Sequence, residues 1–271
     1  MTVYPQPGSG PDRERLVTAD GKGWVLVWRA DRSRPENEWR AHDTGVNAVT
    51  TFTDPDDGVV LATAGQDGTV RLWDPRGGRE LGRLTGHEGP VHAVTAYTDP
   101  EDGVVLATAG QDGTVRLWDP RGGRELGRLT GHEGPVHAVT AYTDPEDGVV
   151  LATAGQDGTV RLWGPRGRSA AGQPAAPPSP VRALAEAADP ADGGLLCVAY
   201  ADGGVARFGA SDGARRTAPD PGGPSSPWRP WRTPRAAGCW PRPTPTGASA
   251  SAASPIRGPD RGGRTARAGA G

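Results

Sequence analysis

The residues of this sequence that could do chemistry recur at a fixed interval. His87, Thr108, Asp112 and Trp118 form one set, and the same residue types return 45 positions earlier and 45 positions later. Histidine and aspartate are common groups in acid–base catalysis. A catalytic centre needs one convergent set of unlike groups, so near-identical repeated sets favour a structural role. The sets are His42, Thr63, Asp67 and Trp73; His87, Thr108, Asp112 and Trp118; and His132, Thr153, Asp157 and Trp163.

A metal centre is a second chemical interpretation of the histidines. His92 and His137 stand close in sequence to His87 and His132, but zinc needs three or four converging ligands and these pairs belong to separate repeats. The stretch 99–103 and its copies faintly resemble an acidic calcium loop without the spacing of an EF-hand. Asp-Pro and Asp-Gly pairs form turns by themselves. We therefore expect no metal, no other cofactor and no catalytic residue.

The repeat itself predicts the elements that hold these residues. Residues 57–118 return unchanged as 102–163, and a period of this size is typical of an array of one supersecondary unit. Val104–Ala109 is apolar and β-branched, Gln111-Asp-Gly113 is a hairpin signal, and Thr114–Trp118 alternates between two faces. With two further runs, each unit contains four short strands and no helical periodicity.

Small sheets of this kind must pack against copies of themselves. Radial packing gives a β-propeller, and linear stacking gives a β-solenoid. Solenoid coils are usually shorter and lack long antiparallel hairpins. We therefore predict an all-β fold, a β-propeller of about five four-stranded blades, followed by a disordered C-terminal tail. Five blades leave three alternatives: a closed ring, an incomplete or open ring, and a ring completed by a second chain.

The repeated motif resembles the Gly-His and Trp-Asp signature of the WD40-repeat family. Gly86-His87 and Trp118-Asp119 carry both halves, while Ala41 replaces the first glycine and Gly164 the last aspartate in the neighbouring repeats. The resemblance implies that the His, Thr, Asp and Trp of each set form a buried hydrogen-bonded chain. It also implies a non-catalytic scaffold that holds protein partners.

The predicted domain organisation follows the register of the repeat. The blades lie near 1–42, 46–85, 91–130, 136–175 and 181–210, and 211–271 forms a Pro-, Gly-, Ala- and Arg-rich tail with too few aliphatic residues to fold. In this register Met1–Tyr4 lies opposite Val46–Val49. Lys22 replaces the turn aspartate of the first blade, and proline near Ala171–Pro174 argues against a fourth strand in the fourth blade.

Composition indicates a compartment and excludes some partners. Two cysteines form no disulfide framework, and neither a signal peptide nor a run of about 18 apolar residues is evident. The predominance of arginine over the single lysine, Lys22, favours a bacterial, GC-rich gene. We expect a cytoplasmic protein that binds no membrane. The diffuse arginines of the tail indicate a solvated segment rather than a nucleic-acid site.

The loops at the rim of the blades are the predicted partner-binding surface, because binding residues usually lie on loops of a rigid scaffold. Its members precede the turn aspartate, begin a strand or follow the Gly-His pair: Asn47, Gln66, Glu88, His92, Gln111, Glu133, His137 and Gln156. An open ring also predicts homo-oligomers through the exposed terminal blades. The chain further fits a fragment of a larger regulatory protein. Alternatives are a metal-dependent hydrolase at the propeller axis and a decayed gene product without stable function.

Overall fold

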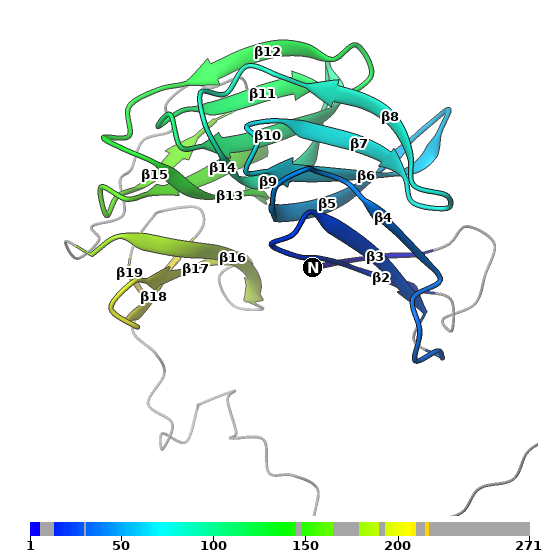
Figure 1. The fold of residues 1–271 in the computed structure, drawn as a ribbon. Helices are drawn as coiled ribbons and strands as arrows, with labels where there is room; N and C mark the ends of the chain where they lie inside the picture. Colours follow the sequence, from blue (N-terminus) through cyan, green and yellow to red (C-terminus); the bar gives the residue numbers. More distant parts are fainter. Residues whose placement is uncertain are drawn as a thin grey trace, which may run out of the picture. The chain divides into compact units, whose positions relative to one another are not determined.

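The computed structural model describes residues 1–5, 14–29, 31–144, 148–164, 179–189, 193–209 and 215–216. The chain divides into a unit of residues Met1–Pro219 and a unit of residues Asp220–Gly271. All described strands belong to the first unit (Figure 1). The predicted disordered tail, 211–271, lies outside the described residues except at 215–216. The described part contains no helix, and so none that could cross a membrane.

Five antiparallel sheets follow one another along the chain, each with its strands in sequence order. The first three sheets contain β1 (Thr2–Pro5), β2 (Glu14–Ala19), β3 (Trp24–Arg29) and β4 (Asn37–Arg40); β5 (Val46–Asp54), β6 (Gly58–Gly65), β7 (Val70–Asp74) and β8 (Arg79–Leu84); and β9 (Val91–Asp99), β10 (Gly103–Gly110), β11 (Val115–Asp119) and β12 (Arg124–Leu129). The last two contain β13 (Val136–Asp144), β14 (Gly148–Gly155) and β15 (Val160–Trp163); and β16 (Val181–Asp189), β17 (Gly193–Tyr200), β18 (Val205–Gly209) and β19 (Arg215–Arg216).

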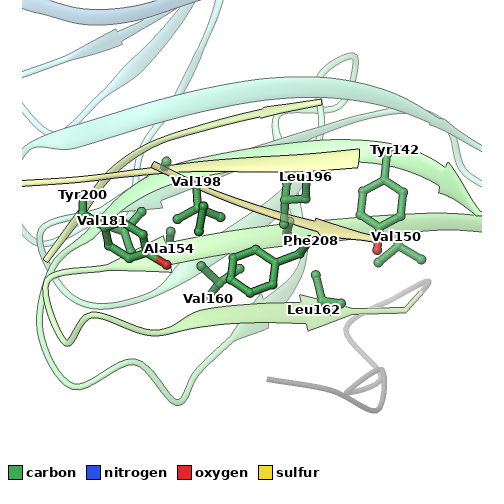
Figure 2. Close-up of a cluster of buried hydrophobic side chains, with 13 residues drawn as sticks. Tyr142, Val150, Ala154, Val160, Leu162, Val181, Leu196, Val198, Tyr200 and Phe208 are labelled. Carbon is green, nitrogen blue, oxygen red and sulfur yellow. The ribbon is translucent and has the colours of Figure 1, made fainter. Parts of the chain in front are cut away.

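Apolar side chains on both faces of each sheet explain why the sheets pack against their neighbours. Val70 and Leu72 of the second sheet share a buried cluster with Leu106 and Trp118 of the third. The same arrangement joins the first to the second, the third to the fourth, and the fourth to the fifth sheet. Figure 2 shows the last of these clusters, in which Phe208 of β18 is buried.

The packing of successive sheets forms an open β-propeller. The first strands β5, β9, β13 and β16 contact one another in order. Among the residues that the structure describes, no buried apolar cluster joins the fifth sheet to the first. The predicted all-β propeller is therefore confirmed, and among the alternatives for its ring the structure has the open one.

The first strand adopts a register different from the one that sequence spacing predicts. Thr2 pairs with Val17 in the first sheet, where Thr50 pairs with Ala62 in the second. Tyr4 therefore occupies the place of Phe52, and the predicted alignment of Met1–Tyr4 with Val46–Val49 is wrong. The connection between β1 and β2 is longer than its counterpart, and this shift buries Tyr4 in the core.

The fifth sheet continues beyond the boundary at residue 210 that composition indicates. Arg215 pairs with Phe208, and Arg216 pairs with Arg207. Edge strands are held by backbone hydrogen bonds, so a strand without apolar residues escapes a search based on composition. The missing fourth strand predicted for the fourth sheet, near Ala171–Pro174, falls outside the described residues.

Candidate functional site

A chain of hydrogen bonds crosses the third sheet from its core to its turn. Trp118 Nε1 donates to Thr108 Oγ1 at 2.8 Å, and Thr108 Oγ1 lies 2.8 Å from His87 Nε2. His87 Nδ1 lies 2.9 Å from Asp112 Oδ2. The carboxylate accepts a hydrogen bond from the Nδ1–H group, which leaves Nε2 to accept a hydrogen bond from the threonine hydroxyl. All four side chains are thus satisfied by one another.

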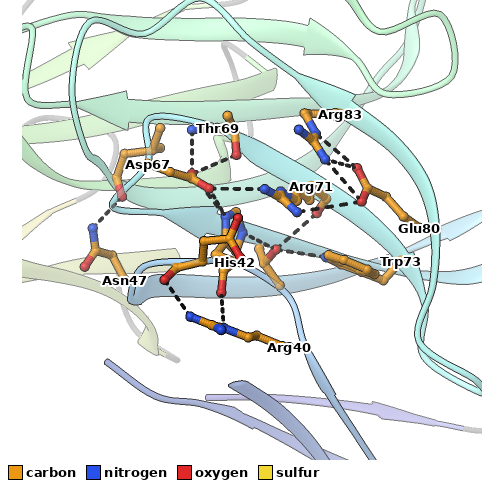
Figure 3. A network of polar contacts seen from close by, with 12 residues as sticks. Arg40, His42, Asn47, Asp67, Thr69, Arg71, Trp73, Glu80 and Arg83 are labelled. Atoms are coloured by element: carbon orange, nitrogen blue, oxygen red, sulfur yellow. Dashed lines mark hydrogen bonds and ion pairs between the residues drawn. The ribbon is translucent and has the colours of Figure 1, made fainter. Parts of the chain in front are cut away.

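The second and fourth sheets contain the same chain. In the second sheet, His42 contacts Thr63 at 2.8 Å and Asp67 at 2.9 Å, and Trp73 donates to Thr63 at 3.0 Å (Figure 3). The fourth sheet repeats these contacts at 2.8 to 3.0 Å. Its members are His132, Thr153, Asp157 and Trp163. The structure therefore brings together each of the three sets found in the sequence.

Burial and hydrogen bonding fix the charges of these chains. Burial lowers the pKa of His87 and His132, so both imidazoles are neutral at pH 7. Burial alone would raise the pKa of Asp112, but hydrogen bonds from the Glu88 N–H, Thr114 and His87 outweigh it and lower the pKa to about 2. The same balance lowers the pKa of Asp157 to about 2. The chains of the third and fourth sheets are therefore each a neutral imidazole held by a carboxylate.

Gly110 is part of this arrangement, although sequence reasoning passed over it. A Cβ atom at Gly110 would collide with His87 Nδ1 and would lie 2.7 Å from Asp112 Oδ1. Gly65 and Gly155 hold the same place beside His42 and His132. Recurrence of glycine two residues before each turn aspartate was the available signal.

The first and fifth sheets retain only parts of the hydrogen-bonded His–Thr–Asp–Trp chain. Trp28 Nε1 still donates to Thr18 Oγ1 at 2.8 Å in the first sheet. Lys22 stands at the aspartate position, and Asp20 accepts the turn N–H groups of Lys22 and Trp24 instead, each at 2.9 Å. In the fifth sheet Phe208 replaces the tryptophan, and its ring needs no hydrogen-bond partner.

The predicted rim residues are brought together only in part. Asn47 Nδ2 donates to the Val91 carbonyl at 2.8 Å, and Gln66 Nε2 donates to Asn47 Oδ1 at 3.4 Å. His92 Nε2 lies 2.8 Å from Gln111 Oε1, and the rings of His92 and His137 are 5.1 Å apart. The Asn47–Val91 and His92–His137 contacts link neighbouring sheets at the starts of their first strands, whereas the two glutamine contacts lie within one sheet.

The remaining rim residues are exposed. Glu88 and Glu133 use their backbone N–H groups to hold Asp112 and Asp157, at 3.1 and 3.0 Å, while their side chains lie on the surface. Gln156 is also exposed. Arg182 was missed, although it stands 45 residues after His137 and likewise follows the first residue of its strand.

The opposite ends of the strands hold a cavity of about 310 Å³ between the second and third sheets. Its lining includes the carboxyl residues Asp54, Asp102 and Asp119 and the guanidinium of Arg121. Within the described residues, no group of three or more His, Cys, Asp and Glu side chains is arranged to hold a metal ion. The three carboxyl residues of the cavity are therefore not grouped as metal ligands in the described part of the chain.

Comparison with known proteins identifies the repeat. The family described as WD domain, G-beta repeat, matches residues 33–74, 78–119 and 123–164. A segment of 38 residues is 34% identical to ASTRA-associated protein 1 of Scheffersomyces stipitis; it is 14% of this chain and 9% of that protein. The computationally designed Ika8 protein has a similar fold, with a TM-score of 0.55 and 23% identity over 70% of this chain. The match spans 54% of the Ika8 chain.

Proposed function

Because three WD40 repeats match within residues 33–164, we propose that the chain is a non-catalytic scaffold that binds protein partners through its rim loops. Proteins of this family are generally non-catalytic, and WD40 domains generally mediate protein–protein contacts. The observation that carries the proposal is the satisfied state of the three buried chains. Their histidines and aspartates hold the loops in place, which leaves the exposed residues of the same loops for a partner.

The starts of the first strands support this location. His92 and His137 come from different sheets, and their rings are in contact in a tilted arrangement. The ring centroids are 5.1 Å apart, and the angle between the ring planes is 56°. The adjacent Gln111 is hydrogen-bonded to His92 and exposed. A surface of this kind is polar and pre-organised, and a pre-organised surface loses less conformational entropy on binding.

Substitution on the two ends of the strands tests the proposal. We would compare capture of cellular proteins by the full chain, by a variant with His92→Ala, Gln111→Ala and Glu133→Ala, and by a control. The control carries Thr98→Ala and Thr143→Ala, exposed positions near the opposite ends of β9 and β13. Loss of the captured proteins only in the rim variant supports the proposal. Equal capture by all three chains contradicts it.

Self-association through the terminal sheets is a second proposed role. Val205 of the fifth sheet is 68% exposed, whereas Val70, Val115 and Val160 at the equivalent positions are at most 1% exposed. Val3 of the first sheet is 50% exposed. In the inner sheets the next sheet covers this valine, and a second copy of the chain offers a sheet of the same kind.

Light scattering over a range of concentrations tests self-association. We expect the mass of the wild-type chain to rise with concentration and that of Val205→Asp to stay at the monomer value. Val205 is exposed, so its replacement leaves the fold intact. A monomer at every concentration would remove this role while leaving rim binding in place.

The proposal also covers the source of the protein, its compartment and the class of its partners. We propose a bacterial, cytoplasmic protein whose partners are proteins, and neither nucleic acid nor membrane. Cys197 is not in a disulfide, in keeping with a reducing compartment. We also propose that this chain is one module of a larger regulatory protein.

A further inference from the structure

Four polar residues occupy the same place in four successive sheets. Asn47, His92, His137 and Arg182 are the second residues of β5, β9, β13 and β16. We call them the inner polar row. Their strands contact one another in this order, so the row crosses the ends of neighbouring strands. Its character changes from a neutral amide, through two imidazoles, to a guanidinium.

His137, one of the two imidazoles of the row, lies near His92 and the guanidinium of Arg182. His137 is partly buried, and burial, His92 and Arg182 together lower its pKa. His92 is hydrogen-bonded to Gln111, a neutral residue, at 2.8 Å. Asp112 and Asp157, the carboxylates of the nearby turns, hold His87 and His132.

Glu88 and Glu133 are the charged residues on the loops before β9 and β13, and their side chains are exposed. The row itself contains no carboxylate. Its cationic end therefore offers hydrogen-bond donors with a positive field and no acidic group of its own to neutralise them.

We propose that His137 and Arg182, assisted by His92, bind an anionic group of the protein partner, a carboxylate or a phosphate. The inference rests on the proposed function and names the chemistry of the partner. A guanidinium matches a carboxylate or phosphate with two parallel hydrogen bonds. A protonated imidazole adds a charged donor, and the bound anion offsets the repulsion between His137 and Arg182.

The proposal predicts that binding strengthens in mild acid. The anion favours the charged form of His137, so binding takes up a proton and the affinity rises as the pH falls toward the pKa of the free imidazole. A site made only of arginine would show no such dependence toward a carboxylate between pH 7.5 and 6, because arginine and glutamate both stay charged in that range.

Titration of the full chain with defined probes tests the inference. The probes are inorganic phosphate, a hexaglutamate peptide and a hexalysine peptide, followed by calorimetry at pH 7.5 and 6. We expect binding of phosphate or hexaglutamate, and the stronger of the two identifies the source of the anion. The dependence on pH is read from hexaglutamate, whose charge stays constant in this range and whose binding should strengthen at pH 6. Arg182→Ala should weaken it about tenfold, whereas Arg182→Lys should retain part of it.

Matched variants separate the site from general charge. Arg79→Ala removes an exposed arginine of β8 and should leave binding unchanged, while His137→Ala should abolish the dependence on pH. Binding of neither anionic probe, equal binding of hexalysine, or unchanged affinity in Arg182→Ala and His137→Ala would each overturn the inference. Loss of partner capture in the rim variant together with such a result would leave the proposed function standing.

Discussion

Arg121 Nε lies 2.7 Å from Asp54 Oδ2, and this ion pair joins a turn of the third sheet to a turn of the second. A second guanidinium nitrogen contacts Asp54 at 3.0 Å and Asp56 at 2.6 Å. The hydrogen bonds from Arg121 hold the pKa of Asp54 well below its usual range. The His–Thr–Asp–Trp chains tie each sheet to its own loops, whereas this pair ties two sheets together.

Arg121→Ala should lower the melting temperature, because the buried carboxylate of Asp54 would keep only its backbone donors. The loss should shrink in high salt, which screens the exposed part of the pair. Thermal unfolding followed by circular dichroism at low and high ionic strength measures both effects. Arg76→Ala, at the equivalent place one repeat earlier, is the control, since Arg76 has no ion pair within the described residues. Identical melting of the two variants would refute the assigned role.

Thr108→Val should destabilise the protein by about 1–3 kcal/mol, because it leaves the Trp118 N–H and His87 Nε2 unpaired in the core. Thr108→Ser keeps the hydroxyl and should recover most of the loss. His87→Ala should cost a similar ~1–3 kcal/mol, because the Thr108 hydroxyl and the Asp112 carboxylate would both lose their hydrogen bonds to the imidazole. Urea unfolding measures these free energies. A serine variant as unstable as the valine variant would show that the methyl group, and not the hydroxyl, is responsible.

The free energy of unfolding should fall in two stages as the pH is lowered. His87 and His132 have lowered pKa values in the fold, so the unfolded chain takes up their protons first and stability falls below about pH 6.5. Asp112 and Asp157 have pKa values of about 2 in the fold, so each contributes about 2 kcal/mol that is lost between about pH 4 and 2. Asp112→Asn should remove the part of the second stage that Asp112 contributes, and the parts from the other aspartates with lowered pKa values should remain. Stability independent of pH between 7 and 4 would contradict the neutral assignment of the histidines.

The repeat made most of the fold predictable from sequence. The features that could not be predicted lie where the first and last repeats depart from the others. Thr108, Asp112 and Trp118 could be grouped from sequence because the repeated motif resembles the WD40 signature, and the exact period presents that signature three times. The register of β1 could not, because Tyr4 reaches the core only through a longer connection that spacing does not reveal. The role of Arg182 was hidden for a related reason: its repeat is divergent, so only its place after the first residue of a strand remained.

Gly110→Ala should be the most damaging single methyl group in the third sheet. The added Cβ would collide with His87 Nδ1 and crowd Asp112, so the imidazole would have to move and its hydrogen bonds to Asp112 and Thr108 would lengthen. Overpacking and a broken buried chain together predict a loss of about 2–4 kcal/mol in urea unfolding.

Gly77→Ala is the matched control for this substitution. A Cβ at Gly77 meets no atom within 4 Å, so the same methyl group should be neutral or slightly stabilising through the unfolded chain. The fluorescence of Trp118 should also change in Gly110→Ala, because the tryptophan N–H shares the Thr108 hydroxyl with His87. If both alanine variants unfold at the same urea concentration, the histidine has room to move, and the buried chain is looser than its distances indicate.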